Sequence, residues 1–420
     1  MRIAVVGGGV AGLYSAWHLA KRHEVILLER ESRIGGHTDT HEIQLESSPE
    51  PVAVDTGFIV FNPPNYPLFS AWLGELGVQT RVSDMSFGVS CGLTGLEYNA
   101  TDLNGLFCQR KNLLRPEFLG MVRDILRFYR QAADWLEQLD ETTTLGQWLA
   151  DSDFGEAFGR DHLVPMAAAL WSSPGERILE FPMKYMLEFM QNHSMLQATG
   201  RPEWQTVRGG SQQYVAAALA RFEGRVALRS AVRRVARSAS GVTVETDAER
   251  VEVDTVVLAC HADQALAMLH DPTPSERRVL GAFRYQDNDV LLHTDAGRMP
   301  RHRRAWASWN VRRDPHMPER AAISYWMNRL QGLPVSEPLI VSLNQADSVD
   351  PDRVLARRGY RHPIYTPESR AAQRQLDAIS GSDRIWYCGA CWGWGFHEDA
   401  VRSARKVVDG LRQERLSHAA

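Results

Sequence analysis

Short apolar runs and glycines alternate over the first 28 residues of the chain. Residues 2–6 form an apolar run, glycines follow at positions 7, 8, 9 and 12, and residues 13–21 have the apolar spacing of an amphipathic helix. A second apolar run, residues 24–28, ends at Glu29. The pattern predicts a strand, a glycine turn, a helix and a second strand, in that order.

Helical periodicity dominates the next part of the chain. Residues 68–76 are predicted to form a helix, and residues 81–99 alternate apolar and polar positions, which predicts two or three strands. Residues 116–139 have the apolar spacing of one long helix, and residues 145–195 that of several further helices. These segments predict a helical lobe at about residues 113–200.

The second half of the chain returns to apolar strands. We expect helices at residues 211–221 and 398–412, a hairpin formed by residues 225–238 and 241–246, and strands at residues 254–259, 290–293, 305–310, 321–326, 339–343 and 385–388. The run at residues 254–259 is apolar nearly throughout, as is typical of a buried parallel strand. The four strands between residues 290 and 343 are rich in tryptophan and tyrosine and are predicted to share one sheet.

The order of these elements predicts an α/β fold with two discontinuous domains. A chain of 420 residues exceeds what one hydrophobic core usually supports. We predict a Rossmann-type domain built from residues 1–60, 205–272 and 370–420. An α+β substrate domain is predicted from residues 61–204 and 273–369.

Composition narrows the class of protein. A net charge of −4 and 23% charged residues give no strong field, so we expect no nucleic-acid partner. No apolar run approaches the roughly 18 residues of a membrane span, and we therefore expect a soluble, cytoplasmic protein. The five cysteines are an odd number in a long chain, which argues against a disulfide framework. No second CxxC or paired histidines accompany the one CxxC, so no metal site is expected.

The spacing of the N-terminal glycines fits the binding of an adenine dinucleotide. Gly7 permits a tight turn, Gly9 lets the backbone approach a pyrophosphate, and Gly12 lets helix and strand pack closely. The helix N-terminus supplies N–H groups and partial positive charge for the phosphates. Glu29 follows the glycines by about 20 residues, where such units place the acid that binds ribose hydroxyls.

Further motifs resemble one family of flavoproteins. They are Arg33-Ile34-Gly35-Gly36-His37-Thr38, Asp55-Thr56-Gly57, Val207-Arg208-Gly209-Gly210-Ser211, Ala231-Val232, Cys388-Gly389-Ala390 and Gly395-Phe396-His397-Glu398-Asp399-Ala400. In this order they resemble the motifs of the FAD-containing amine oxidases, phytoene desaturases and protoporphyrinogen oxidases. The resemblance implies a glutathione-reductase-like FAD domain and FAD as the cofactor.

The same resemblance implies which residues bind FAD. They are Gly7, Gly9, Ala11, Gly12, Glu29, Arg30, Arg33, Gly35, Gly36, His37, Thr38, Asp55, Thr56, Gly57, Phe58, Val232, Gly389, Phe396, His397 and Ala400. In the family, the backbone N–H that begins the closing helix faces the flavin pyrimidine oxygen, and the matching residue here is His397. A simpler interpretation is that His397 only caps the helix with its side chain in solvent, and because the inferred role belongs to the backbone, the two interpretations are compatible. His37 stands where the family carries an arginine, which is a departure from the pattern.

Four residues are candidates for contact with the substrate. Phe396 occupies the position where many amine oxidases carry a tyrosine of the aromatic pair around the amine, and Trp394 lies beside it. These rings could hold a cation, an alkene or an acyl chain, or could only shield the flavin from water. Lys184 could match a family lysine that holds a water near the flavin, although a surface lysine is the simpler interpretation. Tyr66 could face the substrate or belong to the core.

The cysteine pair Cys388 and Cys391 leaves two interpretations open. The pair could be a redox centre beside the flavin. The simpler interpretation is that Cys388 ends a buried strand and that Cys391 is a small residue near the cofactor.

A finer resemblance concerns the substrate. Asp55-Thr56-Gly57-Phe58, Asn65-Tyr66-Pro67, Leu292-His293-Thr294-Asp295, Trp306-Ala307-Ser308-Trp309-Asn310 and Gly395-Phe396-His397-Glu398-Asp399 resemble a bacterial subfamily of FAD-binding amine-oxidase-like proteins. This implies a link to cyclopropane-synthase-like lipid methyltransferases and to unsaturated acyl chains of phospholipids. Arg110, Lys111 and Arg115 could contact anionic headgroups at the inner membrane face, or could be a solvated edge.

The favoured activity is therefore hydride abstraction from a lipophilic substrate, with formation of a double bond in an unsaturated acyl chain. The electron acceptor, oxygen or another oxidant, is left open. Three alternatives remain: oxidation of an amine, flavin-dependent isomerisation of a double bond, and a lipid-binding protein of the same fold without catalysis. The intact set Gly7, Gly9, Gly12, Glu29 and Arg33 argues against the last of these.

Overall fold

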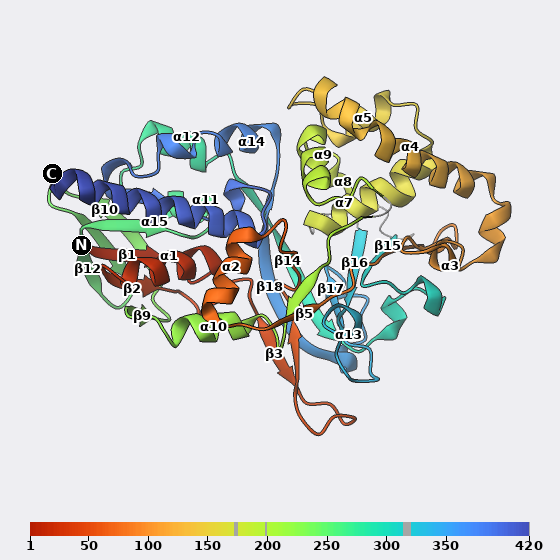
Figure 1. Ribbon diagram of the computed structural model, residues 1–420, viewed down its shortest axis with the longest axis horizontal. Coiled ribbons are helices and arrows are strands. Elements are labelled where there is room, and N and C mark those ends of the chain that lie inside the picture. Colours follow the sequence, from red (N-terminus) through yellow and green to blue (C-terminus); the bar gives the residue numbers. More distant parts are fainter. Residues whose placement is uncertain (172–174, 198–199, 314–320, 420) are drawn as a thin grey trace.

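The computed structural model describes residues 1–171, 175–197, 200–313 and 321–419, and Figure 1 shows two halves joined by long strands. One half is built on a five-stranded parallel sheet in the order β19-β13-β1-β2-β9. Its strands are β1 (Arg2–Val6), β2 (Glu24–Leu28), β9 (Arg225–Ala227), β13 (Thr255–Leu258) and β19 (Ile385–Tyr387). All five lie within the three ranges expected for the FAD domain, although the domain boundaries themselves stay a prediction.

Helices cover one face of this sheet and a small second sheet covers the other (Figure 1). The first layer contains α1 (Val10–Ala20), α2 (Pro67–Leu76), α10 (Gln212–Leu219) and α15 (His397–Ala419). The second layer contains the strands β10 (Val232–Arg237), β11 (Val242–Thr246) and β12 (Arg250–Val253) with the helices α11 (Ala262–Met268), α12 (Pro274–Leu280) and α14 (Pro367–Gln373). Two apolar cores therefore enclose β1, whose residues are buried from Ile3 to Val6.

The other half contains a seven-stranded sheet in the order β18-β14-β17-β16-β15-β6-β7. Its strands are β6 (Phe87–Cys91), β7 (Glu97–Asn99), β14 (Arg284–His293), β15 (Trp309–Arg313), β16 (Ala321–Trp326), β17 (Ile340–Leu343) and β18 (Val354–Ile364). Two further pairs, β3 (Thr40–Ile43) with β4 (Val52–Asp55) and β5 (Thr80–Val82) with β8 (Gln205–Val207), lie between the halves.

A helical lobe packs over this sheet (Figure 1). It contains α4 (Pro116–Gln138), α5 (Leu145–Asp151), α6 (Glu156–Phe158), a π-helix (Gly159–Leu163), α7 (Val164–Trp171), α8 (Gly175–Ile178) and α9 (Met183–Asn192). Two short helices outside the lobe are α3 (Leu103–Leu106) and α13 (Met327–Leu330). Short 3-10 helices occur at Arg110–Leu114, Ala296–Arg298, Arg303–Ala305, Pro351–Arg353, Leu376–Ala378, Ser382–Arg384 and Ala390–Trp392.

Three predictions of local structure are wrong, and one strand was not predicted. The first strand of the expected hairpin is divided, because β9 joins β2 in the parallel sheet and only β10 pairs with β11. The strand expected at residues 305–310 begins at Trp309, after a 3-10 turn. The helix α1 begins at Val10, three residues earlier than its apolar spacing indicated. The eleven-residue strand β18 was not predicted at all.

Within the described residues, no helix is long and apolar enough to span a membrane. The same residues contain no group of three or more histidine, cysteine, aspartate or glutamate side chains arranged to hold a metal ion.

Candidate active site

The glycine turn between β1 and α1 lies at the wall of a large cavity. Gly7 has φ +104°, and a Cβ on Gly12 would lie 1.8 Å from the Gly7 carbonyl oxygen. A Cβ on Gly9 would meet nothing within 4 Å, and Gly9 lines the cavity together with Ala11. Gly7 and Gly12 are therefore required by the packing of the turn. Gly9 instead leaves its backbone accessible to phosphate groups at a helix N-terminus.

Glu29, at the end of β2, holds this turn in place. Its side chain is buried, with Oε2 accepting from the Gly8 N–H at 2.6 Å and Oε1 accepting from the Glu31 N–H at 2.9 Å. Glu29 also lines the cavity, as do Arg30 and Val232, at the start of β10. The structure thus places the acid, the glycines and the start of β10 around one cavity, as the sequence predicted.

Arg33 supports the second glycine turn. Its guanidinium donates to the carbonyl oxygens of Gly36 and Thr38, both at 2.8 Å, and pairs with Asp39 at 3.0 Å. Gly35 and Gly36 have φ of +135° and +59°, which favour glycine. The arginine therefore shapes the loop that presents the paired glycines and His37 to the cavity. Thr38 does not line the cavity; its hydroxyl hydrogen-bonds Tyr214 and His397 instead.

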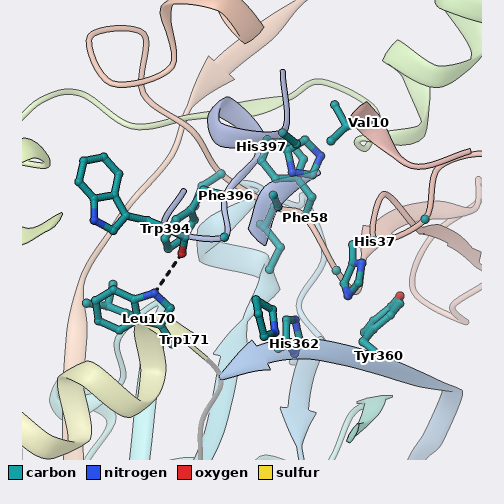
Figure 2. Close-up of a pocket in the computed structure, with 18 of the residues that line it drawn as sticks. Val10, His37, Phe58, Leu170, Trp171, Tyr360, His362, Trp394, Phe396 and His397 are labelled. Atoms are coloured by element: carbon teal, nitrogen blue, oxygen red, sulfur yellow. Dashed lines mark hydrogen bonds between the residues drawn. The ribbon is translucent and has the colours of Figure 1, made fainter. Parts of the chain in front are cut away.

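His37 belongs to a cluster of rings that face one another in the cavity (Figure 2). Its ring centroid lies 5.0 Å from that of Tyr360, 5.2 Å from His362 and 6.1 Å from His261. Burial lowers the pKa of His37 to about 4 and the pKa values of His261 and His362 to about 3. His37 Nε2 and His261 Nδ1 are buried with no hydrogen-bond partner among the described residues. Each of these two rings therefore has one nitrogen without a protein partner beside the cavity.

Asp55 lies behind the cavity wall rather than in it. Its carboxylate is fully buried and accepts from the Thr40 hydroxyl, the Ser211 N–H and hydroxyl, and the Gln331 amide. Burial raises the pKa of Asp55 to about 6. The expectation of direct contact with a cofactor is corrected: Asp55 ties the end of β4 to the start of α10.

The residues that follow Asp55 do reach the cavity. Thr56, Gly57 and Phe58 all line it. A Cβ on Gly57 would lie 2.0 Å from the His37 carbonyl oxygen, so only glycine fits where the two loops cross. The Phe58 ring stacks on His397 with centroids 3.5 Å apart (Figure 2).

The N-terminus of α15 points into the same cavity. Its first residue, His397, lines the cavity together with Gly389, Phe396 and Ala400. Asp399 Oδ2 accepts from the Phe396 N–H at 3.1 Å, and Glu398 accepts from two N–H groups that begin α2. Burial lowers the pKa of His397 to about 3, and its Nε2 lies 3.2 Å from the Tyr214 hydroxyl. The side chain of His397 is thus enclosed by protein, not placed in solvent.

Aromatic rings form the adjoining wall. Phe396 stacks on Phe189 with centroids 4.9 Å apart, and the Trp394 carbonyl accepts from Trp171 Nε1 at 3.1 Å (Figure 2). Tyr66 is 2% exposed and lines the cavity, and burial raises the pKa of its hydroxyl far above 10. Of the four candidates for substrate contact, Phe396, Trp394 and Tyr66 therefore lie at the cavity.

The fourth candidate, Lys184, does not reach the cavity. Its Nζ donates to the Leu139 carbonyl at 3.0 Å, which fastens α9 to the end of α4. The prediction of a catalytic Lys184 is corrected. Cys388 and Cys391 are both free and buried, and burial raises the pKa of each thiol to about 12. Protonated thiols are poor nucleophiles, so the packing interpretation of this pair is favoured.

The cavity is one continuous space of about 1690 Å³. It runs from the glycine turn past the α15 N-terminus to a region lined by apolar side chains from α4, α7 and α9. The main apolar residues of this region are Val122, Ile125, Leu126, Met166, Leu170 and Phe189. A cavity of this size has room for both a dinucleotide and a second, lipophilic molecule.

Several lining residues were not identified from the sequence. His162 is a buried polar group that lines the cavity, Arg201 is an exposed one, and His362 belongs to the ring cluster. None lies in a motif, and each reaches the cavity only because separate segments pack together. The sole local signal was the concentration of apolar and aromatic residues in the helical lobe around His162 and His193.

Comparisons with known proteins bear on the family and the fold of the chain. The family model described as "Flavin containing amine oxidoreductase" matches residues 10–290. A Mycobacterium tuberculosis (strain H37Rv) protein assigned as the flavin-containing monoamine oxidase AofH is 28% identical over 282 residues, which make up 64% of this chain and 59% of that protein. The chain thus matches less than two thirds of the length of this relative.

Two solved structures show the same fold. A CLA-producing fatty acid isomerase from P. acnes has a TM-score of 0.70 at 15% identity, with 97% of this chain and 98% of that chain covered. Cyclohexylamine oxidase from Brevibacterium oxydans IH-35A has a TM-score of 0.67 at 15% identity, with 98% of this chain and 99% of that chain covered. At these identities the similarity establishes the fold alone.

Proposed function

The chain belongs to the flavin containing amine oxidoreductase family, and from this premise we propose that it is an FAD-dependent oxidoreductase that removes hydride from a lipophilic acyl-chain substrate. Membership of the family confirms the assignment of a flavin cofactor. The family leaves the substrate open, so the acyl chain has to be argued from the cavity.

The observation that carries the proposal is the continuity of the cavity. One space contains the glycine turn, the α15 N-terminus and an apolar region walled by Ile125, Met166 and Leu170. Transfer of a hydrocarbon chain from water into such a region is favourable by roughly 0.8 kcal/mol for each CH₂ group. An apolar substrate bound in this region would therefore lie next to the residues that would surround a flavin.

We assign the FAD to the residues between the glycine turn and α15. Gly9 and the N-terminus of α1 would hold the pyrophosphate, and Glu29 would bind a ribose. The N-terminus of α15 at His397 would face the pyrimidine edge of the flavin. The observed fit supports this assignment: the Gly9 backbone is open, and His37 Nε2 is buried without a partner among the described residues. When bound, FAD supplies the two-electron acceptor for a hydride.

The protein's own groups would position the substrate and exclude water. Phe396 and Trp394 supply flat apolar surfaces beside the α15 N-terminus, and the buried Tyr66 remains a neutral phenol because burial raises its pKa. The partial positive charge of the α15 N-terminus would stabilise negative charge on the reduced cofactor. Removal of the hydride itself needs no strong base. The new double bond would form when the neighbouring carbon loses a proton, for which water or the neutral ring of His193 at the cavity would be the acceptor.

Amine oxidation is the second candidate function. The aromatic wall formed by Phe396, Trp394 and Phe189 could hold an ammonium group through cation–π contacts. The names of the relative AofH and of cyclohexylamine oxidase also point to amines for those proteins. Phe396 lacks the tyrosine hydroxyl, and this favours the acyl chain.

Two further activities are consistent with the same cavity. The P. acnes structure is named as a fatty acid isomerase, and isomerisation differs from desaturation only in that hydride returns to the substrate. A carrier without catalysis is disfavoured, because the glycine turn and Glu29 retain the geometry that a dinucleotide requires. The association with cyclopropane-synthase-like methyltransferases is retained as part of the proposal and rests on the sequence motifs alone.

We propose in addition that the cavity is filled from a membrane surface. Five of the exposed large apolar side chains of the described residues fall within one short stretch of α3, the following 3-10 helix and α4: Leu103, Leu113, Leu114, Leu119 and Leu126. Leu103 and Leu126 also line the cavity. Arg110, Lys111 and Arg115 lie in the same stretch and would face anionic headgroups. We name the five leucines the leucine patch.

Product analysis tests the proposed activity. FAD-loaded protein is incubated aerobically with dioleoyl phosphatidylglycerol, and the lipid is examined by mass spectrometry. A loss of two hydrogens per reacted chain is the expected product of desaturation. An unchanged mass with a moved double bond would indicate isomerisation. If the lipid is unaltered and putrescine or cyclohexylamine is oxidised instead, amine oxidation replaces the proposal. Gly9→Ala, which should fold without binding FAD, serves as the control.

A further inference from the structure

His193 follows the last residue of α9 and lines the cavity. The turn after it is closed by backbone hydrogen bonds, of which the first runs from the Ser194 N–H to the Gln191 carbonyl at 3.0 Å. The Met195 N–H donates to the Met190 carbonyl at 2.8 Å, which completes a Schellman motif. Ser194 has φ +52°, a conformation in which glycine is usual at this position. The backbone around His193 is therefore held in one geometry.

One hydrogen bond determines which ring nitrogen of His193 can accept a proton. Nδ1 lies 3.1 Å from the carbonyl oxygen of Phe189, one helical turn earlier. A carbonyl oxygen only accepts, so Nδ1 is the donor and the neutral ring keeps its lone pair on Nε2. Nε2 has no hydrogen-bond partner among the described residues. Burial lowers the pKa of His193 to about 4, and the ring is therefore neutral at pH 7.

The His193 ring lies beside all three rings of the aromatic wall. The ring centroids around it are those of Phe189 at 4.0 Å, Phe396 at 6.0 Å, Tyr66 at 6.1 Å, Trp204 at 6.2 Å and Trp394 at 6.3 Å. Phe189 belongs to the apolar region, and Phe396 precedes the first residue of α15. His193 thus lies where the apolar region meets the α15 N-terminus.

The other histidines that line the cavity are less suitable as proton acceptors for a substrate in the apolar region. Nε2 of His162 is enclosed by protein, and Nε2 of His397 lies 3.2 Å from the hydroxyls of both Thr38 and Tyr214. Among the described residues, the three histidines of the ring cluster make no ring contact with the aromatic wall. Position and tautomer together single out His193.

Desaturation requires an acceptor for a proton as well as one for a hydride. Loss of hydride from the CH₂ group next to a double bond leaves an allylic cation. When the adjoining CH₂ group loses a proton, the electron pair of that C–H bond forms the second double bond. Isomerisation has no such step, because the hydride returns to the substrate. Amine oxidation has none either, because the lone pair of the nitrogen forms the new double bond to carbon.

We propose that His193 is the base of the desaturation, and that its Nε2 takes the proton from the carbon next to the allylic cation while the hydride passes to bound FAD. This inference rests on the proposed function, in which it selects His193 over water as the acceptor. The imidazolium so formed is stabilised by the aromatic faces around it, among them Trp204, whose ring is stacked on His193. It then releases its proton to water, because its pKa lies well below neutral pH.

Nitrogen-15 NMR of the histidine rings in the FAD-loaded protein tests the tautomer without turnover. The signals of His193 are those that His193→Gln removes. At pH 7 they should show a neutral ring with its proton on Nδ1. A proton on Nε2, or a charged ring at this pH, would overturn the inference.

The rate at which dioleoyl phosphatidylglycerol bleaches the flavin without oxygen tests the proton transfer. His193→Gln and His193→Gly should each slow bleaching about a hundredfold or more, as loss of a general base implies. Imidazole should restore part of the rate to His193→Gly, and lipid that still reacts with His193→Gln should be isomerised at unchanged mass. His18→Gln is the control, since His18 has a similarly lowered pKa of about 4 and does not line the cavity.

Bound flavin and the unfolding temperature establish that each variant is folded. Bleaching by folded His193→Gln at the wild-type rate would overturn the assignment of the base and leave the proposed function intact. A loss of rate that imidazole does not restore would overturn it too, since His193 would then serve in packing. If no acyl chain bleaches the flavin of the wild-type protein, the proposed function itself fails, and the reaction that this base serves fails with it.

Discussion

Gly9 and Gly12 lie three residues apart and have different functions in the turn. A Cβ on Gly12 would meet the Gly7 carbonyl oxygen at 1.8 Å, whereas a Cβ on Gly9 would meet nothing within 4 Å. Gly12→Ala should therefore lower the free energy of unfolding by about 3 kcal/mol or more, because backbone must move. Gly9→Ala should cost within about 1 kcal/mol at this N-cap and should greatly weaken FAD binding. Urea unfolding of the apoprotein and titration with FAD measure the two effects.

The comparison of these two variants separates folding from cofactor binding. Gly9 has φ −69° and ψ 179°, a conformation that alanine adopts without strain. A Gly9→Ala protein that binds FAD as tightly as the wild type would contradict the assignment of the pyrophosphate to this turn. A Gly12→Ala protein of unchanged stability would contradict the packing described here.

The histidine cluster predicts a pH dependence of stability. Burial lowers the pKa of His37 to about 4 and the pKa values of His261 and His362 to about 3. The unfolded chain, with histidine pKa values near 6.5, binds more protons than the folded one as the pH falls. The contribution of these histidines to the free energy of unfolding is therefore fully present above about pH 6.5 and is lost as the pH falls from 6.5 to 4. The unfolding temperature of the apoprotein should fall over this range.

His37→Gln should reduce the acid dependence slightly, because it removes one of the eight described histidines whose pKa burial lowers and which take up a proton on unfolding. His270→Gln is the control, since His270 is half-exposed and lies outside the cluster. FAD should also reduce the dependence, because its phosphate charge raises the pKa of nearby histidines. A pH profile that neither FAD nor His37→Gln alters would show that the cluster does not face the cofactor.

Residues within local motifs were predictable from the sequence, and residues assembled by tertiary contacts were not. The roles of Gly7, Gly9 and Glu29 follow from short-range spacing within one strand–helix–strand unit. His362 and His162 reach the cavity from β18 and from the π-helix, two segments that share no motif. Lys184 was misassigned because its place on a helix does not reveal which face is buried.

At the scale of elements, β18 shows why one long strand was missed. Residues 354–364 include Arg357, Arg358 and Arg361 and have no clear apolar alternation. The strand lies at the edge of its sheet, where charged side chains are tolerated and hinder pairing with other chains. Hydrogen bonding to β14 stabilises this strand although its apolar alternation is weak. The pairing also places His362 at the cavity. Such pairing between distant segments leaves no signal in a local window.

The leucine patch on α3 and α4 predicts membrane binding. Leu119 and Leu126 lie two helical turns apart on α4 and are 42% and 49% exposed. Replacing both by aspartate should lower binding to phosphatidylglycerol vesicles at least about tenfold, through loss of apolar burial and through charge repulsion. Vesicle sedimentation measures the effect. Added salt should weaken binding of the wild-type protein, because it screens the attraction of Arg110, Lys111 and Arg115 to the anionic lipid. Leu228→Asp, at an exposed leucine outside the patch, is the control.

Vesicle binding that the double variant retains would contradict a role for the leucine patch. An equal loss of vesicle binding in the Leu228→Asp control would also contradict this role, since the loss would then not depend on the position of the leucine on α4.

At the scale of the whole molecule, the site lies where two halves meet. The parallel sheet supplies the glycine turn and Glu29, and the seven-stranded sheet supplies β18 with Tyr360 and His362. The helical lobe adds the apolar region. The sequence predicted the two halves, because apolar runs and motifs recur in a characteristic order. The continuity of the cavity across them depends on side-chain packing and became evident only in the structure.

The visible spectrum of the FAD-loaded protein, recorded without oxygen before and after addition of dioleoyl phosphatidylglycerol or oleate, shows whether acyl chains reduce the flavin. The flavin absorbance should bleach with these acyl chains and remain unchanged with putrescine, cyclohexylamine or oleylamine. Gly9→Ala should show no bound flavin. Bleaching by the amines alone would contradict the account and would establish amine oxidation instead.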